Sequence, residues 1–166
     1  MKPNGLPTTA LTTLVFIVAL AAAWPMQAQD AKSPYPSMAP IDQYLMERNA
    51  EIALARSAAP ESISKDAEVM VLGRNGYETA VKGQNGFVCV VHRSWTSGID
   101  DPEFWNPKRR GPICFNAPAA RSYVPNTIMR TNLVLAGRSK AEIFEAITAA
   151  FQKRNCRPSN PAQCAT

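Results

Sequence analysis

The chain has 166 residues, a net charge of +5, four cysteines and one histidine, His92. This length is typical of one domain that buries its own hydrophobic core. A single histidine limits from the outset both general acid–base catalysis and metal binding.

The first 28 residues show the order of parts of a secretory signal peptide. Lys2 precedes an entirely apolar run over residues 14–23, which is shorter than the roughly 20 apolar residues that span a bilayer. Pro25 then breaks the helix, and Ala28 is small enough to precede a cleavage site. We expect cleavage after Ala28, with Ala23 as the alternative. The mature protein is then periplasmic or extracellular and has no stable transmembrane segment, whereas the competing interpretation is an uncleaved membrane anchor.

The charges divide unevenly along the exported part. Residues 29–103 carry 7 basic and 11 acidic side chains, whereas residues 104–166 carry 10 basic and 2 acidic ones. A basic half of this kind is suited to an anionic partner, such as a charged ligand or a lipid surface. The alternative is that the two halves pack together and their fields partly cancel.

All four cysteines follow the expected cleavage site, in a compartment where disulfides persist. Four cysteines allow three pairings. We favour Cys89 with Cys114, which lie in apolar segments, and Cys156 with Cys164, which flank a Pro-containing stretch. Free, buried thiols are the alternative.

The pattern along the mature chain predicts one α+β domain over residues 41–155. Residues 29–40 contain three prolines and are expected to form a linker, and residues 156–166 are expected to form a loosely ordered tail.

A first helix is expected over residues 42–57, because this stretch is rich in helix formers and Pro60 follows it. Asp42 is the expected N-cap. The expected face of the helix, with its polar margin, consists of Leu45, Asn49, Ile52 and Arg56.

Three short runs rich in β-branched and aromatic residues follow, at residues 68–72, 77–81 and 87–93. Asn-Gly pairs stand between them at 75–76 and 85–86, and Asn-Gly is the strongest short signal for a hairpin. We therefore expect a three-stranded antiparallel meander.

Residues 97–118 hold four prolines and several large aromatic side chains, and they are expected to form an ordered loop. A C-terminal helical pair follows. Pro125 is expected to divide its first part into a short helix from Ala119 and a helix over residues 126–136. Gly137 caps that end, and Ser139 with Glu142 forms a capping box for the last helix. The last helix has an apolar stripe that must pack on another element: Ile143, Phe144, Ile147, Ala150 and Phe151.

Cys89 and His92 are a candidate nucleophile and base. Positions three apart in a strand point to opposite faces, however, and a thiol in a disulfide cannot attack a substrate. A zinc site from His92, Cys89 and Cys114 is disfavoured for the same reason, because exported thiols tend to pair as disulfides. We expect no metal and no cofactor.

Asp100, Asp101 and Glu103 form an acidic cluster inside the aromatic loop. Paired carboxylates can hydrolyse glycosidic bonds. Asp before Pro more commonly starts a turn, and this structural interpretation is preferred.

A basic triplet, Lys108 to Arg110, follows Trp105 in the same loop. Arginines beside an aromatic ring are suited to a phosphate-bearing or other anionic ligand. The alternative is a solvated turn whose arginines pair with the acids eight or nine positions earlier. Residues 135–143 loosely fit the turn of a DNA-binding motif, but helix capping explains the same residues and we expect no nucleic-acid partner.

The segments VLGRNGYETAVKGQNGFVCVVHRSW and DDPEFWNPKRRGPICFNAPAARS resemble a family of exported bacterial proteins of unknown function. The resemblance runs from about Ile41 to Phe151, and its motifs occur in the same order. It implies export and one shared fold, and it implies no activity. Members of that family commonly continue into a segment rich in His, Trp and Met, whereas this chain ends in NCRPSNPAQCAT, so no residue-level role is transferred.

The sequence thus predicts a small exported binding or structural module. Its ligand site is expected where the loop over residues 95–110 meets the open face of the sheet. The expected binding residues are His92, Trp105, Lys108, Arg109 and Arg110. The first alternative is a hydrolase that uses His92 with Asp100 or Asp101, and the second is a protein held on an anionic surface.

Overall fold

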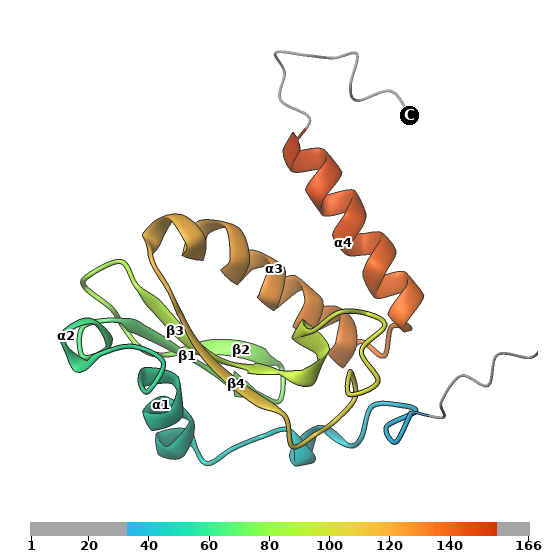
Figure 1. Ribbon diagram of the computed structural model, residues 1–166, viewed down its shortest axis with the longest axis horizontal. Coiled ribbons are helices and arrows are strands. Elements are labelled where there is room, and N and C mark those ends of the chain that lie inside the picture. The colour runs from blue at the N-terminus through green and yellow to red at the C-terminus, as the bar shows by residue number, and fades with distance from the viewer. Residues whose placement is uncertain (1–32, 156–166) are drawn as a thin grey trace, which may run out of the picture. The chain divides into compact units, whose positions relative to one another are not determined.

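A four-stranded sheet lies between helices in the computed structural model, which describes residues 33–155 (Figure 1). The helix α1 packs on one face of the sheet, and α3 packs on the other. The α+β class predicted from the sequence is confirmed. The elements are η1 (Ile41–Gln43), α1 (Arg48–Arg56), α2 (Glu61–Ser64), β1 (Glu68–Gly73), β2 (Gly76–Val81), β3 (Val88–Arg93), η2 (Ser94–Thr96), β4 (Arg110–Phe115), α3 (Ala117–Leu135) and α4 (Lys140–Asn155).

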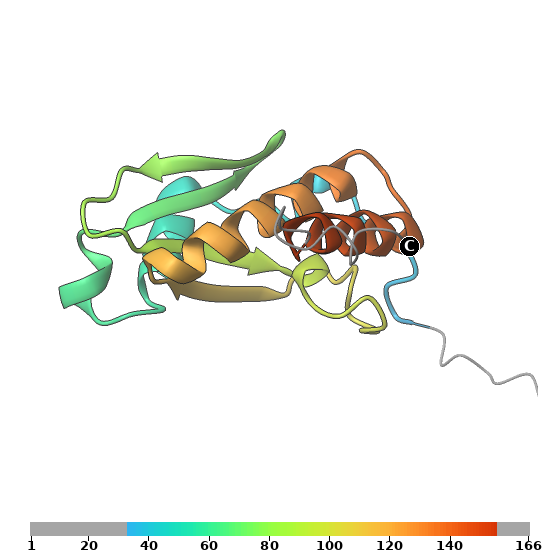
Figure 2. The same cartoon turned by 90° about the horizontal axis from the view of Figure 1, so that it is seen from above.

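The sheet is mixed, with the strand order β2-β1-β3-β4 (Figure 2). β1 pairs antiparallel with β2 and parallel with β3, and β3 pairs antiparallel with β4. The three predicted strands exist, but the predicted antiparallel meander is wrong, because β3 does not pair with β2.

The two Asn-Gly turns behave differently. The first closes the β1–β2 hairpin, with Gly73 opposite Gly76 and Gly76 at a φ of 122°. At the second, Gly86 also has a positive φ, of 77°, but the turn does not return the chain along β2.

Residues 82–87 instead carry the chain across the start of β1. The backbone N–H of Gln84 donates to the carbonyl of Asp66, and the N–H of Glu68 donates to the carbonyl of Phe87, each over 2.8 Å. A Cβ on Gly83 would collide with the backbone nitrogen of Glu68, so only glycine permits this close approach. The crossing delivers β3 to the free side of β1.

β4 lies inside the segment that was expected to be a loop. Its register places Cys114 opposite Cys89 and Pro112 opposite Val91. Pro112 obscures the strand in the sequence, because proline cannot donate to a ladder; it is tolerated here because β4 is an edge strand.

The first helix is shorter than predicted, and its buried face differs. α1 begins after Glu47, whose carboxylate accepts hydrogen bonds from the N–H groups of Asn49 and Ala50, so the predicted cap at Asp42 is wrong. Asp42 instead forms an ion pair with Arg74. The helix buries Glu51 and Ala55, while the predicted face residue Asn49 is exposed.

α3 is one helix where two were predicted. The side chain of Asn116 caps it by accepting from the N–H of Ala119 at 3.0 Å. Pro125 lies inside the helix on its exposed side. The capping box is confirmed, since Glu142 accepts from both the N–H and the hydroxyl of Ser139 at 2.8 Å. No helix within residues 33–155 combines the length and the apolar character needed to cross a membrane.

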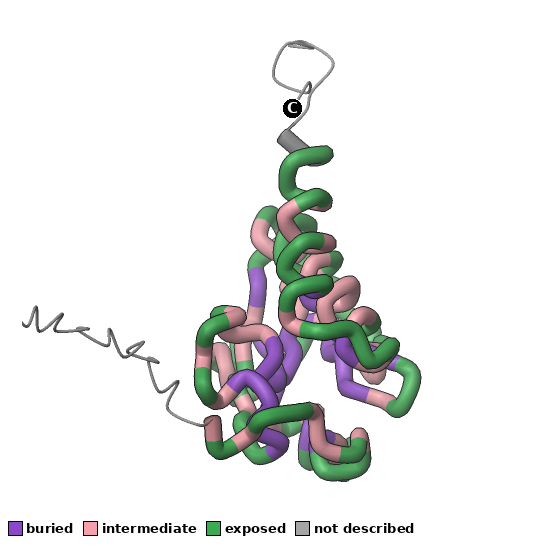
Figure 3. The backbone as a smooth tube through the Cα atoms, turned by 90° about the vertical axis from the view of Figure 1, so that its right-hand side faces the viewer, coloured by how far each residue is buried: buried purple, intermediate pink, exposed green. Residues whose placement is uncertain are grey.

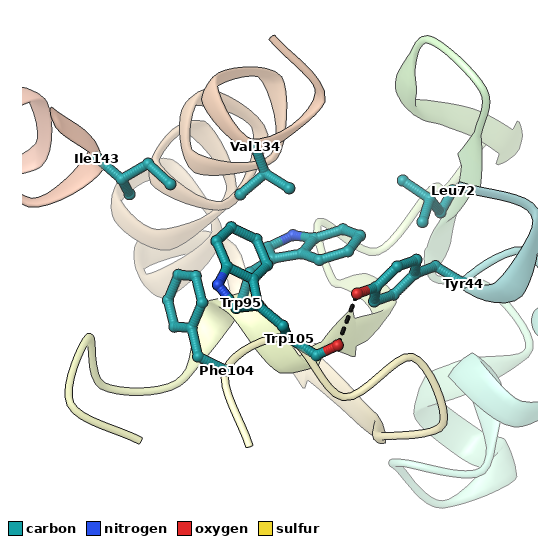
Figure 4. Packing of buried hydrophobic residues seen from close by; sticks show 7 residues of the cluster. All are labelled: Tyr44, Leu72, Trp95, Phe104, Trp105, Val134 and Ile143. Carbon is teal, nitrogen blue, oxygen red and sulfur yellow. Dashed lines mark hydrogen bonds between the residues drawn. The ribbon is translucent and has the colours of Figure 1, made fainter. Parts of the chain in front are cut away.

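The largest apolar cluster joins segments from both ends of the described chain (Figure 4). Its buried members are Tyr44, Leu72, Trp95, Phe104, Trp105, Val134 and Ile143. The Tyr44 hydroxyl donates to the carbonyl of Trp105 at 2.7 Å, which fixes the aromatic loop against η1. Tyr35 and Met38, from the segment expected to be a linker, also pack on this cluster.

A buried ion pair crosses from α1 to the sheet. Glu51 and Arg93 are each 1% exposed, and Arg93 Nη2 lies 2.8 Å from Glu51 Oε2. The other carboxylate oxygen accepts from the N–H of Leu72 at 3.0 Å. Arg93 also donates to the carbonyls of Tyr44 and Val91. The pair therefore holds α1, β1, β3 and the end of η1 together.

Glu51→Gln is expected to lower the free energy of unfolding by about 3 kcal/mol, because Arg93 would remain buried without its counter-charge. The measurement is urea unfolding at neutral pH. Glu78→Gln is the matched control, since Glu78 pairs with Arg48 at the surface and such pairs contribute under about 1 kcal/mol. Equal losses in the two variants would show that burial does not set the strength of the Glu51 pair.

The predicted disulfide between Cys89 and Cys114 is confirmed and joins β3 to β4. Cys89 faces α1, where it packs with Ala55 and Val69. The predicted pairing of Cys156 with Cys164 lies outside the described residues.

The double variant Cys89→Ala and Cys114→Ala is expected to have a free energy of unfolding about 3 kcal/mol lower than the wild type. The reason is that the closed loop of 25 residues no longer restricts the unfolded chain. In urea unfolding, a thiol reductant should lower the free energy of unfolding of the wild type by a similar amount. It should leave that of the variant unchanged. An unchanged stability of the wild type in the reductant would contradict the stabilising role of the disulfide.

Candidate functional site

A cationic pocket of about 280 Å³ opens where β3 and the following turn η2 meet β4. It lies at the edge of the sheet formed by β4, on strands that the buried ion pair and the disulfide hold in place. The pocket is lined by His92, Arg93, Thr96, Ser97, Arg109, Arg110, Gly111, Pro112 and Ile113.

Arg110 is fixed by backbone carbonyls. Its guanidinium donates to the carbonyl of Tyr44 at 2.9 Å, of Gln43 at 3.3 Å and of Pro107 at 2.5 Å. Partial burial lowers the pKa of Arg110, yet an arginine remains charged at any physiological pH. Its positive charge is therefore held in one position before any ligand arrives.

Arg109 pairs with Asp101 across the aromatic loop, at 2.5 Å from Nη1 to Oδ2. Asp101 also accepts from the N–H of Glu103 at 2.8 Å. These contacts, the backbone hydrogen bond above all, lower the pKa of the Asp101 carboxyl. The pairing of an arginine with an acid eight positions earlier agrees with the alternative drawn from the sequence, although Arg109 still lines the pocket.

Four guanidiniums lie in or beside the pocket, and two acids balance them. Arg93 pairs with Glu51, and Arg109 pairs with Asp101. Within the described residues, Arg110 and Arg130 bond to backbone carbonyls and form no ion pair; Arg130 donates to the carbonyl of Thr96 at 3.1 Å. The site thus keeps a positive excess.

His92 faces α3, where its Nε2 lies 3.3 Å from the hydroxyl of Thr127. Burial above all, together with the charges of Arg93 and Arg130, lowers the pKa of His92 to about 4. His92 is therefore neutral at pH 7 and offers the pocket a dipolar ring without a charge.

Three of the five predicted binding residues come together and two do not. His92, Arg109 and Arg110 line the pocket. Trp105 is only 8% exposed, packs in the core and lies outside the lining of this pocket. Lys108 is exposed and lies outside the lining.

The hydrolase alternative requires a carboxylate beside His92. In the described structure the hydrogen bond of the imidazole is with Thr127, and Asp101 is engaged by Arg109. Cys89 and His92 face opposite sides of the sheet, as predicted from their spacing, and Cys89 is held in the disulfide. Among residues 33–155, no group of three His, Cys, Asp or Glu side chains is placed to hold a metal ion.

Sequence reasoning missed Arg93, Arg130 and the hydroxyls of Thr96 and Ser97. Arg93 ends a strand and Arg130 lies in a helix, so no local motif marks either of them. Arg93 meets Arg109 and Arg110 only through the pairing of β3 with β4, and Arg130 reaches the site from α3 by its hydrogen bond to the carbonyl of Thr96. No family model, curated protein or solved structure matches the chain. A functional proposal therefore rests on the geometry of the site.

His92 should make stability depend on pH. Its pKa is about 4 in the folded protein and about 6.5 in the unfolded chain, so the unfolded chain binds more protons between these values. Stability is then complete above pH 6.5 and falls as the pH drops toward 4. Urea unfolding at pH 7 and pH 4.5 should differ by about 2–3 kcal/mol from this group.

His92→Asn is the control, because asparagine keeps a polar side chain opposite Thr127 and does not titrate. Its stability should be nearly flat between pH 6.5 and 4.5. If the variant and the wild type lose stability equally in this window, carboxylates and not His92 cause the loss.

Proposed function

We propose that this chain is an exported binding module that holds a small anionic ligand in the pocket between β3 and β4. The observation that supports it most directly is the positive excess of the site, where Arg110 and Arg130 have no acidic partner among the described residues. The ligand carries a carboxylate, sulfate or phosphate group, because a guanidinium matches such oxyanions through two parallel hydrogen bonds.

The pocket suits binding because its charges are already ordered. Arg110 loses little side-chain entropy on meeting a ligand, since three carbonyls from two segments already fix its guanidinium. Arg109 is 45% exposed at its side chain and can exchange Asp101 for an anion that enters from solvent. Thr96 and Ser97 also line the wall, with their hydroxyls donating to the carbonyls of Arg93 and Ser94.

Export is the second part of the proposal. The apolar run after Lys2, the small residue at Ala28 and the Cys89–Cys114 disulfide support it. A disulfide within the scaffold of the site also suits a protein that binds its ligand outside the cytoplasm.

Arg109→Gln is expected to weaken anion binding at least about tenfold, since a charge-assisted hydrogen bond is lost. The measurement is calorimetric titration of the chain from residue 29 onward with inorganic phosphate, sulfate and acetate in separate experiments. Tighter binding of phosphate or of acetate then distinguishes a phosphoryl from a carboxylate ligand. Lys108→Gln is the matched control, because this neighbouring charge lies outside the pocket.

Gly111→Leu is a steric test of the same site. A Cβ at position 111 would lie 3.7 Å from the Cβ of His92, so a longer side chain enters the pocket without a backbone clash. This variant should fold and lose anion binding. The proposal fails if none of the three anions binds saturably, or if Lys108→Gln weakens binding as much as Arg109→Gln.

A further inference from the structure

The exposed large apolar side chains of the described residues all lie on the last two helices. They are Tyr123 at 60% exposure on α3, and Phe144 at 57% and Phe151 at 49% on α4. Figure 3 shows α4 rising from the rest of the protein with most of its surface exposed. The apolar stripe predicted for this helix is therefore only partly covered: Ile143 is buried, whereas the two phenylalanines face solvent.

The free flank of α4 separates apolar and acidic side chains. Phe144 and Phe151 are spaced by seven residues, so they project within about 20° of one another around the helix. The preceding Lys140 is only partly exposed, and its ammonium lies 4.8 Å from the centre of the buried Phe104 ring. Glu142 and Glu145 point about 100° or more away from Phe144. Glu142 is also held by Ser139 and by Arg138 at the start of the helix. The flank with the two phenylalanines thus carries no acid.

The surrounding segment is basic, and the other half of the protein does not neutralise it. Residues 117–155 hold 6 basic and 2 acidic side chains, whereas residues 33–116 hold 9 basic and 10 acidic ones. Of the ion pairs within residues 33–155, only Arg109–Asp101 joins the acidic part before residue 104 to the basic part after it. Ion pairs with the rest of the protein therefore do not cancel the net charge of this segment, although Arg138 pairs with Glu142 and Arg130 donates to the carbonyl of Thr96.

We propose that the Phe144–Phe151 flank of α4 binds the surface of an anionic lipid bilayer. Two half-exposed phenylalanines on a helix with a basic environment fit the interface between headgroups and acyl chains. The positive segment supplies attraction to anionic headgroups. α4 would lie along the surface, with the acidic flank turned to water.

Charge favours a lipid surface over a second copy of this chain. Two α4 flanks brought together would place two segments with 6 basic and 2 acidic side chains each against one another. Like charges repel in such a contact, whereas an anionic bilayer attracts the same segment. The flank also offers two aromatic side chains and not a broad apolar patch, which is less than a stable dimer interface requires.

The experiment is co-sedimentation of the chain from residue 29 onward with vesicles of phosphatidylglycerol and phosphatidylcholine, compared with phosphatidylcholine alone. This chain contains all of the described residues, 33–155. It should bind the anionic vesicles, and binding should fall at least about tenfold as salt rises from 0.05 to 0.5 M. Phe144→Ser with Phe151→Ser should bind about twentyfold more weakly, since two partly exposed rings no longer leave water.

Tyr123→Ser is the matched control, because it removes an equally exposed aromatic ring from α3 and leaves the α4 flank intact. It should bind like the wild type, and circular dichroism should show that all variants are folded. Equal binding to phosphatidylcholine alone, or full binding by the double phenylalanine variant, would overturn the proposal. So would sedimentation of the wild type as a dimer that Phe144→Ser with Phe151→Ser dissociates, because the flank would then bind a second copy.

Discussion

The ion pair between Glu51 and Arg93 is the constraint on which both the scaffold and the pocket depend. Two charges inside a protein are tolerated only when each is fully hydrogen-bonded, and here the backbone of Leu72, Tyr44 and Val91 completes the set. The carbonyl of Tyr44 accepts from Arg93 and also from Arg110. One backbone oxygen therefore connects the buried pair to the ordered guanidinium of the pocket.

This connection explains how a small domain keeps positive charge at one place. Arg93 is neutralised by Glu51 within the core, so it positions the neighbouring segments. Arg110 donates to the same carbonyl of Tyr44 and lines the cavity. The field of Arg93 and Arg130, added to burial, keeps His92 uncharged. The charge of the pocket is thus carried by arginines alone and stays constant across the physiological pH range, since His92 does not contribute a proton there.

The sequence predicts the α+β class, the first hairpin, the disulfide between Cys89 and Cys114 and the capping box at Ser139. The hairpin and the capping box follow from short local motifs, and the disulfide follows from the number of cysteines and the apolar segments around two of them. The prediction of an antiparallel meander was wrong because an Asn-Gly pair indicates only that a turn occurs. The close approach of Gly83 to the start of β1 determines the direction of the chain after the turn. Continuous apolar runs in β1 and β3, against the polar β2, were the signal for two central strands. His92, Arg109 and Arg110 were predicted for the pocket, whereas Arg93 and Arg130 escaped prediction because they reach it only through sheet pairing and helix packing. Trp105 was misjudged because a core tryptophan and a stacking tryptophan look alike in sequence.

The two proposed surfaces use positive charge in different ways. In the pocket, carbonyl oxygens hold Arg110 in place, so the proposed binding depends on geometry, and one larger side chain at Gly111 is expected to block it. On α4, the two phenylalanines are exposed to solvent. The proposed attraction to an anionic bilayer depends on the net charge of residues 117–155. Salt therefore separates the two: screening weakens a diffuse attraction to a surface more than an anion held directly by a partly buried guanidinium. A lipid surface that holds α4 would leave the pocket, built on β3 and β4, to be filled by its own ligand.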